Sequence, residues 1–116
     1  MEVFLREINA VVGVSGTFVC GMDGSVLAKL MPDNFDATQL ALAARIAGQT
    51  FHALDSTGHR VDDVDLSYDK GRLILKNLRG GILAILCARN INIPLLNLTA
   101  NVAVKKLAAE LESARG

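Results

Sequence analysis

Apolar and polar residues recur along this chain with two periods, which divide it into three helical and five strand-like segments. Apolar residues three or four positions apart predict helices over 2–12, over 36–57 and from Pro94 onward. Strand-like runs cover 14–21, 25–31, 64–68, 72–78 and 82–88, and turn signals such as Asp23-Gly24 and Gly80-Gly81 separate them. The run 82–88 is apolar on both faces, which is typical of a central strand. The pattern predicts one α+β domain over 1–116, with a five-stranded, mostly antiparallel sheet between helices.

Capping residues define the ends of the predicted helices. Asp36 and Gln39 form a capping-box pattern at the start of the second helix, and Gly58 supplies its end. Gly13 is expected to end the first helix. Pro94 suits the first turn of the last helix. The inward face of that helix is predicted to consist of Leu95, Leu98, Val102, Leu107 and Leu111.

The second helix has more apolar surface than one core requires. One stripe faces the protein's own sheet and comprises Leu40, Ala43, Ala44, Ala47, Phe51 and Leu54. A second stripe comprises Leu42, Ile46, Thr50 and Ala53. Because a surface helix needs only one apolar stripe, the second predicts a protein interface, most simply a homodimer. A third, polar stripe of Arg45, Gln49, His52 and Ser56 is either a solvated face or a contact surface for a partner.

Composition limits the classes of function. Hydrophobic residues make up 51% of the 116 residues, and twelve basic residues balance twelve acidic ones. No basic excess indicates nucleic-acid binding, and no polybasic run indicates a membrane surface site. The longest apolar run, 82–88, is too short to span a bilayer. Zero net charge with a high apolar fraction favours association. No signal-peptide pattern is present, so a cytoplasmic location is predicted.

Neither cysteine carries a predicted chemical role. Cys20 and Cys87 both lie in apolar, strand-like runs. Free cysteine behaves as a small hydrophobic residue, and apolar surroundings raise a thiol pKa. Two buried, unreactive thiols without a disulfide are expected in a reducing compartment.

No catalytic residue, metal site or cofactor is predicted. A phosphate-binding loop of the form G-x-x-x-x-G-K-[ST] is absent, so the chain is not expected to be a GTPase. His52, Asp55 and His59 could resemble metal ligands, but helical phase favours a solvated helix end. Asp62, Asp63 and Asp65 lack the spacing of an EF-hand, and an acidic face that protects an edge strand is the simpler interpretation.

The order of elements and several local patterns resemble the roadblock family, also called the dynein-light-chain roadblock domain. The stretches that carry the resemblance are 12–16 (VGVSG), 22–28 (MDGSVLA), the alanine-rich second helix, and 82–86 (ILAIL) followed by 90–93 (NINI). The resemblance covers nearly the whole chain. Pro94 stands where the family often has glycine, which affects only the entry of the last helix.

The resemblance implies a roadblock-like, profilin-like fold and a non-enzymatic function. Members of the family form homodimers or heterodimers in which the second helices pair and edge strands join two sheets. The resulting platform binds small Ras-like GTPases, scaffolds their complexes or acts as a GTPase-activating partner. In bacteria and archaea, relatives often accompany a small GTPase that controls polarity or motility.

Three functions therefore remain open. The first is a homodimeric module that binds or regulates a small Ras-like GTPase, with Arg45, Gln49 and His52 in the contact surface. The second is a scaffold or motor light chain without effect on GTP turnover. The third is a small-ligand sensor, which would require a polar group within the apolar strands. Thr17 and Asn77 are the candidates for that group.

Overall fold

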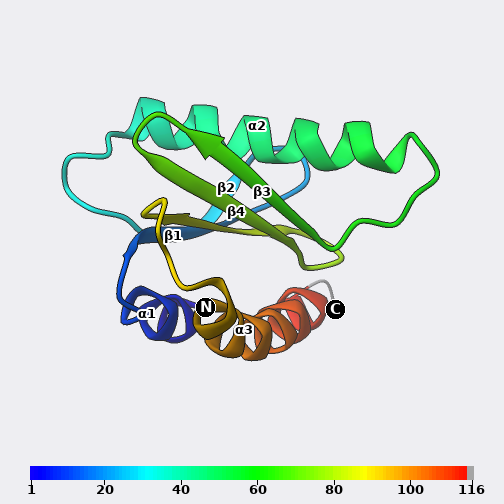
Figure 1. Cartoon of the computed structure of the whole chain (residues 1–116). Helices are drawn as coiled ribbons and strands as arrows, with labels where there is room; N and C mark the ends of the chain where they lie inside the picture. The colour runs from blue at the N-terminus through cyan, green and yellow to red at the C-terminus, as the bar shows by residue number, and fades with distance from the viewer. Residues whose placement is uncertain (115–116) are drawn as a thin grey trace.

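Helices cover both faces of a single five-stranded sheet (Figure 1). The structure is a computed structural model and describes residues 1–114. Its elements are α1 (Glu2–Asn9), β1 (Val14–Cys20), β2 (Val26–Leu30), α2 (Ala37–Asp55), β3 (Asp63–Tyr68), β4 (Gly71–Asn77), β5 (Ile82–Cys87) and α3 (Ile93–Ala114). This order confirms the predicted succession of helices and strands.

The strands pair antiparallel in the order β2-β1-β5-β4-β3. Ile85 in the central strand β5 lies opposite Thr17 on one side and Ile74 on the other. All six residues of β5 are buried, which confirms the prediction of a strand covered on both faces. The edges of the sheet are β2 and β3, and each leaves backbone groups without a strand partner on one side.

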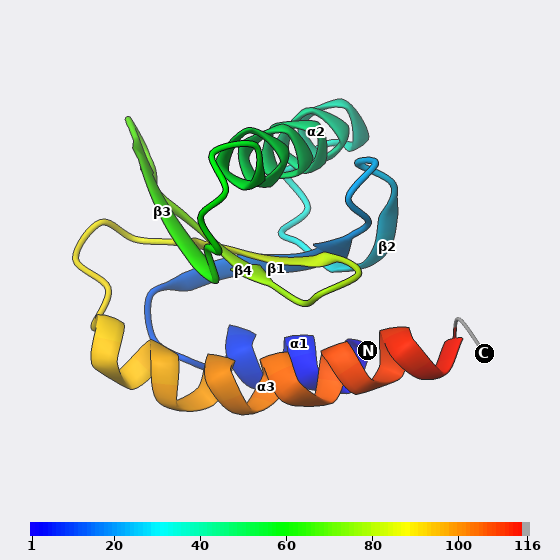
Figure 2. The ribbon, with the colours of Figure 1, turned by 90° about the vertical axis from the view of Figure 1, so that its right-hand side faces the viewer.

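The molecule has three layers, with α2 alone on one face of the sheet and α1 beside α3 on the other (Figure 2). Phe18, Phe51 and Leu75 lie at the centre of the core beneath α2. The core on the opposite face includes Ile85 and Leu96. Each such side chain, when fully buried, contributes about 1.5–3 kcal/mol relative to an exposed one. The two cores hold the sheet between the helical layers.

Local interactions fix both ends of α2. Asp36 Oδ1 accepts a hydrogen bond from the Gln39 backbone N–H at 2.8 Å, and Gln39 Oε1 accepts one from the Asp36 N–H at 3.0 Å. These two bonds confirm the predicted capping box. The helix ends at Asp55, two residues before the predicted end. Gly58 follows with φ of +80°, a backbone conformation that glycine adopts without strain.

The first helix is shorter than predicted. It ends at Asn9, whereas apolar spacing extended it to residue 12. The Asn9 amide donates to the Leu30 carbonyl at 3.0 Å, and its oxygen accepts from the Thr17 hydroxyl at 2.9 Å. These bonds tie the end of α1 to the sheet, so the chain turns there to enter β1. Val12, the last residue of the predicted helix, is 88% exposed.

The inward face of α3 also differs from the prediction. Leu107 and Leu111 are buried as expected, but Leu95, Leu98 and Val102 are exposed, Leu98 by 72%. The buried stripe instead comprises Leu96, Ala100, Ala103, Leu107 and Leu111. The buried stripe keeps a spacing of three or four residues throughout, whereas the predicted set breaks that spacing between Val102 and Leu107, which are five residues apart. The prediction was therefore out of phase in the first half of α3, where Leu96, Ala100 and Ala103 occupy the buried positions.

Candidate partner-binding surface

The outer side of α2 carries an exposed apolar stripe. Leu42 is 49% exposed and Ile46 is 40% exposed, although both are large and apolar. Thr50 is half-buried. Its hydroxyl donates a hydrogen bond to the Ile46 carbonyl at 2.7 Å, so the hydroxyl proton already has a partner within the helix. Ala53 is exposed. We name these four residues the α2 stripe. The structure leaves it uncovered, and its role in a dimer stays a prediction.

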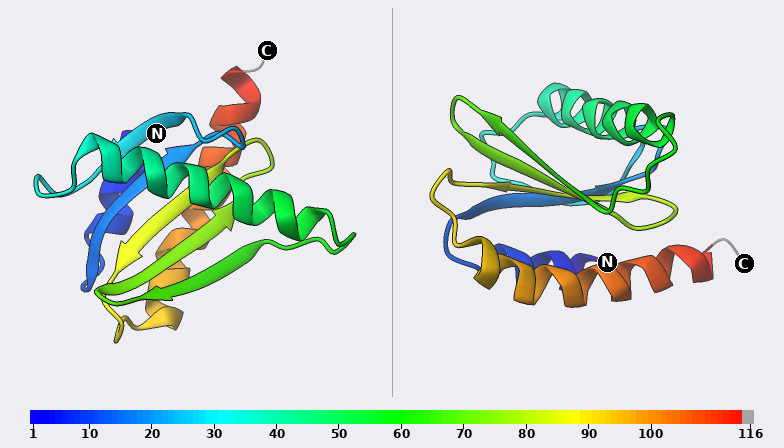
Figure 3. Two further views of the ribbon diagram at one scale, coloured as in Figure 1. Left: turned by 90° about the horizontal axis from the view of Figure 1, so that it is seen from above. Right: turned by 45° about the vertical axis from the view of Figure 1, so that its right-hand side comes forward.

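The α2 stripe lies on the side of the helix that faces strand β3. At about 100° per residue, Ala43 lies between the stripe and the buried face of α2. Ala43 is partly buried and packs against the same core cluster as Val64 and Leu66 of β3. Seen from above, α2 crosses the strands diagonally and β3 forms the outer border of the sheet (Figure 3). The α2 stripe and an open strand edge therefore belong to one flank of the molecule.

The polar stripe lies on the other side of α2, toward the β1–β2 turn. Arg45, Gln49 and His52 are all exposed. A Cβ built on Gly24 of that turn would lie 3.4 Å from the Arg45 Cα, so the backbones are in contact. No hydrogen bond or ion pair within residues 1–114 engages the Arg45 side chain. The structure brings the three predicted contact residues together on solvent-facing surface.

The turn that supports Arg45 is ordered by one carboxylate. Asp23 Oδ1 accepts from the Ser25 backbone N–H at 3.0 Å and from the Ser25 hydroxyl at 2.7 Å. The backbone bond, followed by the hydroxyl bond, lowers the pKa of Asp23 below its ordinary value. Gly24 has φ of +88°, so the turn requires glycine at that position.

The acidic residues near edge strand β3 are paired with cations of the same chain. Asp63 binds Lys76 at 3.2 Å, and Asp65 makes a short ion pair with Arg72. The hydrogen bonds that the Arg72 guanidinium donates to the Asp65 carboxylate raise the pKa of Arg72. A further ion pair joins Asp62 to Arg79. The predicted acidic face is therefore neutralised by neighbouring cations, and these carboxylates are not grouped for calcium.

Lys76 is a buried charge that sequence reasoning missed. Only 2% of it is exposed, on the face of the sheet beneath α3. Its ammonium donates to Asp63 at 3.2 Å and to the side-chain oxygens of Asn97 at 3.1 Å and Asn101 at 3.3 Å. An ammonium has three protons, so these three acceptors satisfy it. The sequence did contain a signal for this buried charge. Lys76 is a charged residue at an inward position of β4, and two asparagines four residues apart on α3 can accept its hydrogen bonds.

The polar groups considered for a ligand sensor are engaged within the protein. The buried Thr17 hydroxyl donates to Asn9. Asn77 donates to the Val61 carbonyl at 3.3 Å and accepts from the Arg79 N–H at 2.9 Å. Within residues 1–114, no buried side-chain nitrogen or oxygen lacks a partner. The same part of the chain holds no cluster of three or more histidine, cysteine or acidic side chains arranged for a metal.

Both cysteines are buried and unpaired, as predicted. Cys20 packs in the core beneath α2 and Cys87 in the core beneath α3, so the sheet separates the two thiols. Burial, with a smaller contribution from Asp23, raises the pKa of Cys20 to about 11. Burial also raises the pKa of Cys87. Both groups are therefore neutral thiols near pH 7.

Thiol labelling should be slow in the native protein. At pH 8, a pKa near 11 leaves Cys20 with roughly a hundredfold less thiolate than an unfolded cysteine, and burial blocks access as well. Labelling with an aromatic disulfide should become at least about a hundredfold faster in denaturant. Cys20→Ser and Cys87→Ser variants assign each rate. Fast labelling of either thiol in native protein would contradict its burial.

The relatives found by sequence have no assigned activity. The uncharacterized proteins MJ0714 and MJ1340 of Methanocaldococcus jannaschii are 29% and 27% identical over 110 residues. The alignments cover 90% of this chain and 91% and 94% of the two relatives. No family model matches the sequence. In the described part of the chain, no helix combines the length and apolarity that crossing a membrane requires.

Solved structures identify the class of fold. A Roadblock/LC7 domain from Streptomyces avermitilis superposes with a TM-score of 0.84 at 18% identity, over 97% of this chain and 98% of that one. A structure described as MglB with tetrameric arrangement gives 0.83 at 17% identity, over 97% and 88%. Profilin IA of Acanthamoeba castellanii gives 0.58 at 16% identity, over 92% and 98%. The chain therefore has the roadblock fold, which confirms the predicted resemblance and its profilin-like architecture.

Proposed function

We propose that this protein is a non-enzymatic roadblock-family module that forms a homodimer and, as a dimer, binds a small Ras-like GTPase. The observation that carries the proposal is the exposed α2 stripe, with Leu42 and Ile46 open to solvent on a roadblock fold. The sequence contains no phosphate-binding loop of its own, so nucleotide chemistry belongs to the partner. Free, buried thiols support the predicted cytoplasmic location.

The dimer joins two copies through α2 and the β3 edge. A twofold axis beside β3 brings the α2 stripes of both copies together, and Thr50 and Ala53 are small enough for close contact between the helices. The free edges of the two β3 strands then meet and extend the sheet. Asp63 and Asp65 already have cationic partners, which reduces like-charge repulsion between the edges. A stable interface of this kind buries about 800 Å² per partner.

The GTPase contact uses the polar stripe beside that seam. Arg45 is an exposed cation without an ion pair in the described residues, and Gln49 and His52 extend the same surface. An exposed cation of this kind steers association with an acidic patch and affects the association rate more than the final affinity. The surface binds the partner and supplies no group to the reaction.

A capture experiment tests the proposal. Affinity-tagged wild-type protein and Arg45→Glu are incubated with a lysate of the organism's own cells, and bound proteins are identified by mass spectrometry. Wild type should recover a small GTPase, and the charge-reversed variant should recover several-fold less. Purified protein alone should neither bind nor hydrolyse GTP.

Each result separates the candidate functions. Lys105→Glu reverses an exposed charge on α3, across the sheet from α2, and should recover as much GTPase as wild type. If wild type recovers no GTPase but remains dimeric, a scaffold or light-chain role replaces the regulatory one. Equal recovery with Arg45→Glu would remove Arg45 from the contact surface.

A further inference from the structure

A second open surface lies on the flank of α2 opposite the proposed dimer seam. Edge strand β2 runs alongside the first half of α2, and an open groove separates them. One part of the groove, about 420 Å³, is lined by residues 26–29 of β2 and by Ala37, Leu40 and Ala41 of α2. It continues into a hollow of about 340 Å³ that shares Lys29, Ala37 and Leu40 and ends at Phe35. The groove therefore follows the whole length of β2.

The groove combines apolar walls with the open outer edge of a strand. Val26 and Leu27 of β2 are exposed despite their apolar side chains. Within residues 1–114 no further strand pairs beyond β2, so alternate N–H and C=O groups of this edge lack a ladder partner. An edge strand beside an apolar groove is the arrangement that binds an extended peptide by adding it to the sheet.

The pairing of β2 with β1 limits the length of an added strand. Val19 lies opposite Ala28 and Cys20 opposite Val26, so Leu27 is the extra residue of a bulge. A bulge interrupts regular pairing and turns the strand locally. Regular pairing is therefore available at 28–30, and the bulge presents Leu27 at the groove as a side-chain contact.

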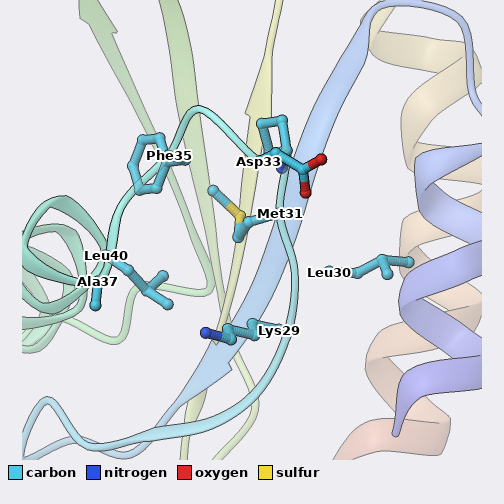
Figure 4. Close-up of a pocket in the computed structure, with 8 residues that line it drawn as sticks. Lys29, Leu30, Met31, Asp33, Phe35, Ala37 and Leu40 are labelled. Carbon is cyan, nitrogen blue, oxygen red and sulfur yellow. The ribbon is translucent and has the colours of Figure 1, made fainter.

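Two cations give the groove its charge. Lys29 points toward the α2 side of β2, whereas its neighbour Leu30 points toward α1 (Figure 4). Lys29 is exposed and has no hydrogen bond or ion pair in the described part of the chain. Arg45 lies near the other end of the groove, next to Gly24 of the β1–β2 turn, and lines an adjoining hollow on α2 with Thr38, Ala41 and Leu42. Asp33, near Phe35, is the acidic residue among the lining residues of these hollows.

We propose that the β2–α2 groove binds a short extended peptide that alternates apolar and acidic side chains on its groove-facing side and adds to the β2 edge. Apolar side chains of the peptide contact Leu27 and Ala41, and carboxylates pair with Lys29 and Arg45. Carboxylates four residues apart in a strand are separated by about 13 Å, which matches about nine residues of helix rise. Ala37, beside Lys29, and Arg45 are eight residues apart on α2, a rise of about 12 Å that is close to this separation.

A defined peptide tests the proposal. The probe is the fluorescein-labelled peptide Thr-Val-Thr-Glu-Thr-Val-Thr-Glu-Thr, whose valines and glutamates share one face when extended. Fluorescence anisotropy should show binding to wild type that is about tenfold tighter than binding of the same peptide with lysine at both glutamate positions. Lys29→Glu should remove or reverse that preference. Amide hydrogen exchange within Val26–Leu30 should slow when the acidic peptide binds.

Control variants distinguish peptide binding at the groove from the proposed dimer and GTPase contacts. Lys105→Glu changes the net charge equally and should retain the preference for the acidic peptide. Lys29→Glu should keep the wild-type oligomeric state, because Lys29 lies away from the α2 stripe. It should also keep GTPase capture, because Lys29 is on β2 and the variant leaves Arg45, Gln49 and His52 unchanged. The proposal is wrong if the acidic peptide does not bind wild type at millimolar concentration, if Lys29→Glu binds it equally, or if the exchange protection falls outside β2.

Discussion

Ile46→Asp should convert the proposed homodimer into a monomer. Ile46 is 40% exposed in the isolated chain and lies at the middle of the α2 stripe. In the proposed dimer the two Ile46 side chains approach each other across the twofold axis, so the variant would bury unpaired carboxylates of like charge. Removing the partner of a buried charge typically costs 3–5 kcal/mol, and a comparable penalty here raises the dimer Kd at least about a hundredfold. Analytical ultracentrifugation at micromolar concentration measures this change.

A matched substitution on α3 controls for the introduced charge. Leu98 is 72% exposed and belongs to a different helical layer from the proposed seam. Leu98→Asp should leave the dimer intact, and both variants should retain a wild-type far-ultraviolet circular dichroism spectrum. A monomeric wild-type protein would contradict the dimer proposal. Dissociation by Leu98→Asp but not by Ile46→Asp would move the interface to α3.

Gly48→Ala should destabilise the protein although alanine favours helices. Replacing a mid-helix glycine normally gains about 1 kcal/mol. Here a Cβ on Gly48 would lie 2.7 Å from the Met22 carbonyl oxygen, which is backbone and cannot turn aside. This clash can be relieved only if α2 moves away from the β1–β2 turn. Overpacking of this kind costs about 1–3 kcal/mol of stability. The net loss is then up to about 2 kcal/mol, and we expect Tm to fall by up to roughly 10 °C.

The neighbouring residue provides the control. Gln49 is exposed on the same turn of α2, so Gln49→Ala should change the free energy of unfolding by no more than about 0.5 kcal/mol. Thermal unfolding at fixed protein concentration compares the two variants. A Gly48→Ala variant more stable than wild type would show that the contact between α2 and the β1–β2 turn can relax without loss of packing.

The apolar pattern along the chain determined which segments are helices and which are strands. The segment that forms β5 contains no polar residue, so it was expected to be a strand covered on both faces. The capping box at Asp36 determined where α2 begins, because the two bonds involved join residues three apart. The sequence also revealed the excess apolar surface of α2, because Leu40 and Ile46 cannot lie on the same face of one helix.

Tertiary structure alone decided where α1 ends and how the charge of Lys76 is buried. The early end of α1 depends on Asn9 reaching Leu30, which is 21 residues away. Lys76 is buried because Asp63 and two asparagines of α3 surround it only after the chain has folded. Interactions between neighbouring residues follow from the sequence directly, whereas each of these features depends on contacts between distant segments that the spacing of residues does not specify.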